Sequence, residues 1–194
     1  MTAPVPSYGG LTWWGNFQEF GFLTMLRAEQ LRDVGATLAP HSAFLLLQGV
    51  ETLPQRMAAH VAGARAVAQW LDADPRVSWV RWAGLPDHPH HDRAARYLPE
   101  GPGAVFSFGV AGGREAGQRF IESVQLASHL ANIGDARTLV IHPASTTHQQ
   151  LTDDQLRDGG VPPDLVRISV GLEDVDDILW DLDQALAAAA KERS

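Results

Sequence analysis

The sequence predicts an α+β fold in which helices pack on one face of a small, mostly antiparallel sheet, preceded by a long kinked helix. Four short β-type runs occur along the chain, at about 77–82, 104–110, 138–141 and 165–170. They alternate with segments whose apolar residues recur at helical spacing, and the longest such segment precedes them all. Helices gathered on one face of a small sheet are typical of this fold class.

The N-terminal segment is rich in aromatic residues. After a lead-in with Pro and Gly, residues 11–26 contain five of them: Trp13, Trp14, Phe17, Phe20 and Phe22. This segment packs either on the chain's own core or on another domain or a second subunit. Residues 25–34 then mix apolar and charged side chains as a half-exposed helix does, and Gly35 is a suitable end for that helix.

Residues 42–73 carry the longest helical pattern in the chain, with apolar residues three and four positions apart. Pro54 lies inside this pattern, where it removes one backbone donor and clashes with the carbonyl four residues earlier. Because the apolar pattern continues in phase beyond Pro54, we expect a kink at 50–54 rather than an end. His41 or Ser42 is a candidate cap for the start of the helix.

A histidine-rich loop follows the first β-type run. Residues 84–92 contain four side chains of metal-ligating type: His88, His90, His91 and Asp92. Pro86 and Pro89 hold this backbone extended, so the side chains splay apart, and no second cluster completes a ligand set. We therefore expect no metal site, and a short helix at 92–98.

The second β-type run leads through Gly112 and Gly113 into another helical pattern. The string GVAGGREAG has neither the G-x-G-x-x-G spacing nor that of a P-loop, so the two glycines indicate a strand-to-helix turn. Residues 114–130 predict an amphipathic helix, and its end brings Asn132 next to the third β-type run. The final helix is predicted at 174–190, with an apolar stripe and with acidic residues, Glu173 among them, at its positive end.

The fourth β-type run carries an arginine between apolar residues. Because side chains alternate along a strand, Val166, Ile168 and Val170 share the face suited to a core, and Arg167 shares the other face with Ser169. A guanidinium held on a strand can bind both oxygens of a carboxylate. Arg167 is thus a candidate carboxylate-binding residue, and the alternative is an arginine at a sheet edge paired with a surface acid.

A serine-hydrolase site is a further possibility, since His142, Ser145 and His148 lie close together in the sequence. However, no G-x-S-x-G motif is present, and Pro143 constrains the backbone between these residues. We expect no catalytic triad.

Composition excludes several classes of protein. The net charge is −8 over 194 residues, which argues against nucleic-acid binding because phosphates require a basic surface. There is no cysteine, so disulfides and thiol catalysis are excluded. Neither a signal-peptide pattern nor an apolar run long enough to span a membrane is visible, and we expect a cytoplasmic protein with no membrane partner.

Three strings resemble a known family. GATLAPHSAFLLLQGVETLPQRM, NIGDARTLVIHPASTTH and DLVRISVGLEDVDDILWDLDQAL are similar to the C-terminal part of the Cys/Met-metabolism family of pyridoxal-phosphate (PLP) enzymes, which have the aspartate aminotransferase-like fold type I. The resemblance extends from about Tyr8 to Leu186, and it is strongest to the family's sulfhydrylases. It implies that Arg167 holds the α-carboxylate of a small amino-acid substrate and that Asn132 assists. The implied reaction is O-acetylhomoserine plus sulfide to homocysteine plus acetate.

The lysine content matters for this resemblance. The family binds PLP as a Schiff base with a lysine, and the only lysine here is Lys191, in a polar tail. We therefore expect no catalytic or cofactor-binding residue in this chain and no PLP bound to it. Instead, the resemblance implies a fragment, with 1–40 the remnant of a large PLP domain and its aromatic insertion, and 41–194 a C-terminal α+β domain.

The partners implied by the resemblance are the missing N-terminal PLP domain and, in the full-length enzyme, further copies of the same protein. The face that carries Arg167 and Ser169 would then lie toward the cofactor domain. Cystathionine γ-synthase and methionine γ-lyase remain alternatives within the family, because the fold and a carboxylate site do not identify the reaction. A non-catalytic interaction module with the same fold is the alternative outside enzymes.

Overall fold

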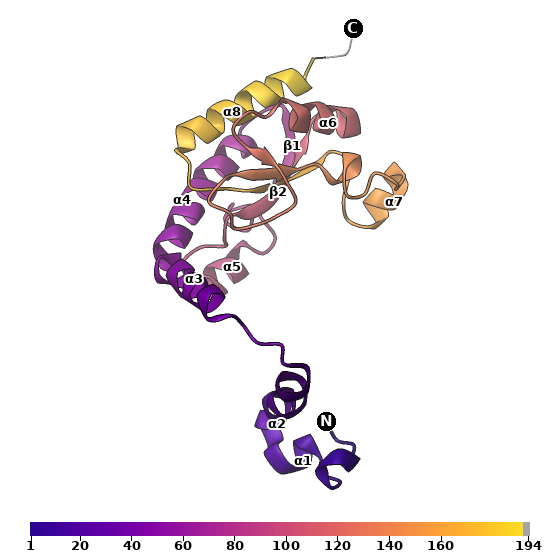
Figure 1. Ribbon diagram of the computed structural model, residues 1–194. Coiled ribbons are helices and arrows are strands. Elements are labelled where there is room, and N and C mark those ends of the chain that lie inside the picture. The colour runs from indigo at the N-terminus through magenta and orange to yellow at the C-terminus, as the bar shows by residue number, and fades with distance from the viewer. Residues whose placement is uncertain (192–194) are drawn as a thin grey trace. The chain divides into compact units, whose positions relative to one another are not determined.

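The computed structural model describes residues 1–191 and divides the chain into two compact units, Met1–Thr52 and Leu53–Ser194. Figure 1 follows the chain through both units. The boundary expected at residue 40 concerns domains of a larger protein, and it stays a prediction.

The first unit is a set of helices: η1 (Pro6–Tyr8), α1 (Trp13–Phe17), η2 (Gln18–Phe20), α2 (Gly21–Met25), the π-helix η3 (Leu26–Val34) and α3 (Pro40–Glu51). Trp13 is buried within it, its ring packed against those of Tyr8 and Phe17. The other aromatic residues of the 11–26 segment are 38–65% exposed: Trp14, Phe17, Phe20 and Phe22. Gly35 has a φ of 75° and ends η3, so that prediction is confirmed.

The long helical pattern is interrupted once. Helix α3 ends at Glu51 and α4 (Leu53–Asp72) begins two residues later, so Thr52 alone separates them. This interruption lies inside the predicted range 50–54, but one helix ends there and a second begins, whereas we expected a kink without an end. Pro54 occupies the second position of α4, where a missing backbone N–H costs nothing.

The start of α3 differs from the prediction. The helix begins at Pro40, after an extended Ala39 whose side chain makes no capping hydrogen bond. His41 and Ser42 therefore lie inside the helix, and their assignment as caps was wrong. A proline is well suited to begin a helix because its φ is already helical, which explains the earlier start.

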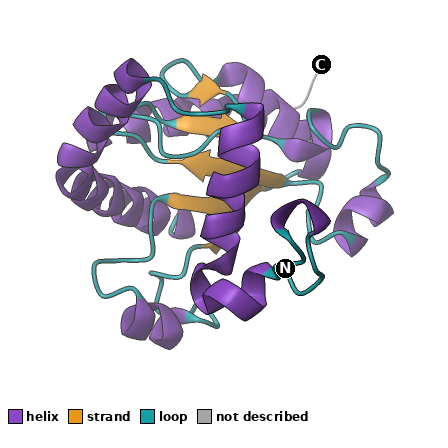
Figure 2. Ribbon diagram, turned by 60° about the horizontal axis from the view of Figure 1, so that its bottom comes forward, coloured by secondary structure: helices purple, strands orange, loops and turns teal. Residues whose placement is uncertain are grey.

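The second unit contains a five-stranded sheet: β1 (Val77–Arg81), β2 (Val105–Val110), β3 (Ser128–His129), β4 (Leu139–Ile141) and β5 (Leu165–Ser169). The strand order is β1-β2-β5-β4-β3, as the arrows in Figure 2 show in part. Every pairing is antiparallel except that of β3 with β4. The four predicted strands are confirmed, and β5 occupies the middle of the sheet.

Helices α4, α6 (Gly113–Ser123) and α8 (Val175–Ala189) contribute their apolar faces to one core with the sheet. Val166, Ile168 and Val170 are fully buried in this core, which confirms the predicted inner face of β5. Helices α5 (His91–Tyr97) and α7 (Asp153–Asp158) and the 3-10 turn η4 (Pro143–Ser145) lie in the connections. Within residues 1–191, no helix combines the length and apolar character that crossing a membrane requires.

Helix α6 is shorter than predicted, and this is the largest error in the predicted fold. It begins after the expected glycine turn, where Gly112 has a φ of 105°, but it ends at Ser123 rather than at 130. The backbone N–H groups of the next residues donate to the carboxylate of Asp181 at 2.7–3.0 Å: Gln125, Leu126 and Ala127. Asp181 on α8 thus draws the chain out of the helix and into β3.

Candidate functional site

Arg167 lies on the central strand, on the face opposite the core. In the register of the sheet it pairs with Ser107 of β2 on one side and with Ile141 of β4 on the other. Its side chain is partly exposed, whereas the residues on both sides of it in β5 are fully buried. The backbone of Arg167 is therefore fixed by two neighbouring strands while its guanidinium remains open to a ligand.

The structure disagrees with the alternative of an edge arginine paired with an acid. The strand that carries Arg167 is the third of five, not an edge strand. Among residues 1–191, no aspartate or glutamate forms an ion pair with Arg167. A guanidinium without a carboxylate partner on a rigid strand is suited to bind a carboxylate from outside the chain.

Asn132 lies beside Arg167, and its part in carboxylate binding stays a prediction. One guanidinium nitrogen of Arg167 donates to the backbone carbonyl of Asn132 at 3.3 Å. The side-chain oxygen of Asn132 accepts from the backbone N–H of Ile133 at 2.9 Å, and the residue is exposed. The backbone carbonyl of Asn132 thus orients the guanidinium of Arg167. The side-chain amide of Asn132 lies on an exposed loop next to it.

The loop that carries Asn132 connects β3 to β4 and is hydrogen-bonded along the end of β5. The backbone N–H of Gly134 donates to Ser169 Oγ at 3.1 Å, and that of Leu172 donates to the carbonyl of Ala136 at 2.7 Å. Glu173 accepts from the backbone and hydroxyl of Thr138. The loop that carries Asn132 is therefore held to β5 and to the segment after it by side chains as well as by backbone hydrogen bonds.

His142 and Ser145 contact each other but do not form a substrate site. His142 is fully buried; its Nε2 lies 2.8 Å from the carbonyl of Pro163, and its Nδ1 lies 2.8 Å from Ser145 Oγ. Because a carbonyl can only accept, Nε2 carries the proton and Nδ1 accepts from the serine. Burial lowers the pKa of the His142 imidazole, so it stays neutral. His148 instead contacts Thr147, and the three residues do not assemble a triad.

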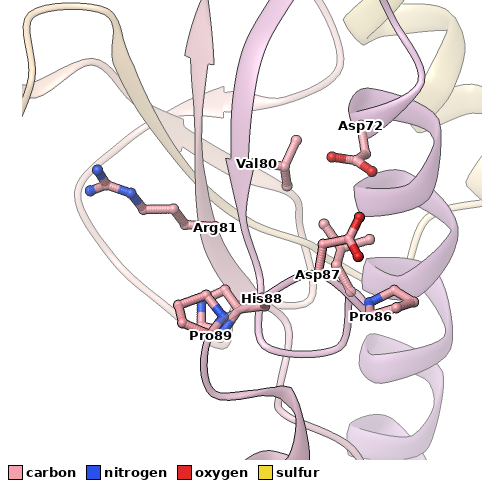
Figure 3. Close-up of a pocket in the computed structure, with 8 residues that line it drawn as sticks. Asp72, Val80, Arg81, Pro86, Asp87, His88 and Pro89 are labelled. Carbon is pink, nitrogen blue, oxygen red and sulfur yellow. The ribbon is translucent and has the colours of Figure 1, made fainter.

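The histidine-rich loop borders a cavity of about 220 Å³. Figure 3 shows Asp87, His88 and Pro89 at this cavity, with Asp72 extending from α4. His88 Nδ1 accepts from the backbone N–H of His90 at 3.2 Å, and His91 contacts the carbonyl of Ala83. Within residues 1–191, no group of three or more His, Cys, Asp or Glu side chains is arranged to hold a metal ion.

The sequence predicted a different role for Glu173 and no role for Ser169. Glu173 was interpreted as an acid that favours the start of the last helix, but Asp174 caps α8 and Glu173 binds Thr138 instead. Ser169 was placed on the Arg167 face with no partner, although it accepts from Gly134. Both partners lie more than thirty positions away in the sequence, so strand periodicity alone gave no signal for them.

Comparison with known proteins relates the chain to one family. A family model described as Cys/Met metabolism PLP-dependent enzyme matches residues 15–187. O-acetyl-L-homoserine sulfhydrylase 1 of Thermus thermophilus is 50% identical over 187 residues, which are 96% of this chain and 44% of that protein. Homocysteine synthase of Schizosaccharomyces pombe is 47% identical over 186 residues, 96% of this chain and 43% of that protein.

A solved structure of a related protein has the same fold as this chain. The crystal structure of a putative O-acetylhomoserine (thiol)-lyase from Campylobacter jejuni matches with a TM-score of 0.84 and 37% identity, over 96% of this chain and 44% of that one. That structure was determined with N'-pyridoxyl-lysine-5'-monophosphate. The chain therefore spans less than half the length of each of these relatives.

Proposed function

The chain belongs to the Cys/Met metabolism PLP-dependent enzyme family, and on this basis we propose that it forms the carboxylate-binding portion of an O-acetylhomoserine sulfhydrylase. The complete enzyme would convert O-acetylhomoserine and sulfide to homocysteine and acetate. The observation that carries the proposal is Arg167, which lies on the central strand with its guanidinium unpaired by any acid of residues 1–191. The names of the relatives support the choice of reaction.

The task of this site is to bind and orient the substrate. Two N–H groups of Arg167 would bind the two oxygens of the substrate α-carboxylate, and the side-chain amide of Asn132 would add a further donor. The carbonyl of Asn132 limits rotation of the guanidinium through the hydrogen bond at 3.3 Å. A carboxylate held in this way fixes the position of the carbon that loses acetate, which lowers the entropic part of the barrier.

The residues of this chain do not fit a PLP site. Lys191, the only lysine, is exposed at the C-terminal end of α8, and α8 packs on the core side of the sheet, opposite Arg167. The lysine and the cofactor, which serves as the electron sink in this family's chemistry, would therefore come from the rest of a longer protein. Incubation with PLP, borohydride reduction and intact-mass measurement test this point. We expect no stoichiometric adduct at one site, and such an adduct would contradict it.

Helix α3 supports a place for this chain within a larger assembly. Its large apolar residues are 55–64% exposed: Phe44, Leu45, Leu46, Leu47 and Val50. Four of them are consecutive, so they point in all directions around the helix axis. A helix that is apolar on all sides is normally buried. We propose that the PLP-binding portion of the complete protein, and further copies of it, cover this helix.

A chimeric enzyme tests the proposed function. This chain would replace the matching 187 residues of the Thermus thermophilus relative, and the product formed from O-acetylhomoserine and sulfide would be measured. We expect homocysteine. Formation of cystathionine from cysteine, or breakdown of methionine, as the main activity would instead favour the two related reactions. A folded chimera that holds PLP but lacks all three activities would favour a non-catalytic module.

A further inference from the structure

We infer that Ser169 and Glu173 are positioning residues, which hold the loop at 132–138 so that Asn132 stays beside Arg167. The inference rests on the proposed role of Arg167 and Asn132 in carboxylate binding. Each of the two residues acts on the loop through its own hydrogen bonds. Their side chains bind two separate points of that loop, Gly134 and Thr138.

Ser169 fixes the part of the loop next to Asn132. It lies two residues after Arg167 on β5, and therefore on the same face of the sheet. Its hydroxyl oxygen accepts from the backbone N–H of Gly134 at 3.1 Å, and Gly134 has a φ of 71°, a left-handed conformation that suits glycine. Because residues 131–134 are exposed, this hydrogen bond has a large share in setting the position of Asn132.

Glu173 fixes the other end of the loop. Its carboxylate accepts from the backbone N–H of Thr138 at 2.7 Å and from the Thr138 hydroxyl at 2.8 Å. The same hydroxyl accepts from the backbone N–H of Gly171 at 2.9 Å, and Thr138 is fully buried. A Cβ at Gly171 would collide with the Glu173 carboxylate and with the backbone between Arg137 and Thr138. Gly171 thus allows the close approach of β5 to the start of β4 that this arrangement needs.

Together these contacts connect the loop to one continuous stretch of chain. Arg167, Ser169, Leu172 and Glu173 bind, in that order, the loop residues Asn132, Gly134, Ala136 and Thr138. These contacts are two, three and one residues apart along β5 and the segment after it, and two residues apart each time along the loop. Asn132 lies at one end of this series, so its position depends on the contacts that follow it.

Amide hydrogen exchange on the chain itself tests the inference. Ser169→Ala removes the acceptor, and we expect the Gly134 amide to exchange about 3- to 10-fold faster, the range that loss of one ordinary hydrogen bond gives. Glu173→Ala, which removes both acceptor oxygens, should do the same at Thr138. Ser169→Thr keeps the hydroxyl and should restore slow exchange, since a cavity of about 290 Å³ beside Ser169 leaves room for a methyl group.

Ser78→Ala is the matched control, because it removes a serine hydroxyl that binds Gly109 and Asp164 elsewhere in the sheet. It should leave exchange at Gly134 and Thr138 unchanged. If Ser169→Ala and Glu173→Ala also leave both amides unchanged, the inference is overturned. Faster exchange throughout the second unit would overturn it too, because the two residues would then stabilise the fold rather than the loop.

Kinetics of the chimera connect the loop to the site. In Ser169→Ala we expect a KM for O-acetylhomoserine raised roughly 3- to 10-fold with little change in kcat, because the lost interaction is made equally in the ground and transition states. A purely structural loss would instead reduce the amount of active enzyme and hence kcat. The two proposals can fail separately: an active Arg167→Ala chimera would end the proposed function, whereas unchanged exchange at Gly134 would end only this inference.

Discussion

Arg167 and Asn132 are joined by a single hydrogen bond of 3.3 Å, from a guanidinium nitrogen to a backbone carbonyl. The two residues come from parts of the molecule with opposite properties. Arg167 lies on a strand that is paired on both sides, whereas Asn132 lies on an exposed loop. The proposed carboxylate site therefore combines the guanidinium of Arg167, on a strand fixed by its neighbours, with Asn132, whose position depends on the contacts of its loop.

Replacement of Arg167 should damage the chimera severely. If Arg167 binds the substrate carboxylate in a desolvated site, Arg167→Ala should cost about 2–5 kcal/mol of transition-state binding. This corresponds to a fall in kcat/KM of about 30-fold to a few thousand-fold. Arg167→Lys should recover little, because an ammonium group lacks the two-pronged geometry. Steady-state kinetics, with the PLP absorbance band to confirm cofactor loading, give the measurement.

Arg81 provides a control on the same face of the sheet. It lies in the same row, paired with Ser107, and its guanidinium stacks over the ring of Trp79 with 4.5 Å to the centroid. Arg81→Ala should leave kcat/KM near the unmodified value. Equal losses in Arg81→Ala and Arg167→Ala would mean that the face needs positive charge in general, and the specific role of Arg167 would be lost.

Replacement of Asp181 should destabilise the second unit. Its buried carboxylate accepts from three consecutive backbone N–H groups, which lose their acceptor in Asp181→Ala. Each of these hydrogen bonds has a charged acceptor, and we expect the loss of all three to lower the free energy of unfolding by about 3 kcal/mol, measured by urea denaturation. Asp181→Asn keeps one acceptor oxygen and should lose less. Asp177→Ala removes an exposed acid from the first turn of the same helix and should change stability by no more than about 1 kcal/mol.

His142 should make the stability depend on pH in the acid range. Burial lowers the pKa of its imidazole below the ordinary value of 6.5. The unfolded chain therefore takes up a proton near that pH and the folded chain only below it. The contribution to stability is present above about pH 6.5 and is lost as the pH falls through the lowered pKa.

The measurement is the free energy of unfolding between about pH 8 and pH 5. We expect a smaller decrease toward low pH in His142→Gln than in the unmodified chain, because the glutamine cannot titrate. A slope unaltered by His142→Gln would show that other groups cause the acid destabilisation.

The exposed apolar residues of α3 should cause self-association of the chain. Leu46 and Leu47 are 60% and 64% exposed, and contiguous apolar surface tends to bind a partner. We expect the chain to form dimers or larger species by size-exclusion chromatography with light scattering. The double variant Leu46→Glu, Leu47→Glu should be monomeric. Trp180→Glu, at a residue 57% exposed on α8, should not change the association, and a monomeric unmodified chain would contradict the prediction.

The parts of the fold that were predictable are those set by local pattern. The alternation of side chains in β5 predicted its buried face and its open face. Gly35 predicted the end of η3, and Gly112 predicted the start of α6. The end of α6 was not predictable because it depends on Asp181, which lies 56 positions after Gln125 in the sequence. The apolar spacing of 114–130 continued past the true end of the helix, so periodicity alone overestimated its length.

The candidate site divides in the same way. Strand alternation identified Arg167 as the charged residue on the open face, but Asn132 was identified only through resemblance to a family. No pattern in the sequence connects the loop at 132–138 to Ser169 and Glu173, because those contacts run between side chains and backbone groups far apart in the chain. Such contacts become visible only when the strand order is known.

Helix α8 has a consequence for how the protein is made. It is the last helix that the structure describes, yet Ile178, Leu182, Ala185 and Leu186 belong to the central core and Asp181 holds the chain after α6. Because a ribosome produces the chain from the N-terminus, residues 53–174 emerge before the helix that completes their core. We expect them to remain incompletely packed during synthesis, and therefore open to chaperones, until α8 has left the ribosome.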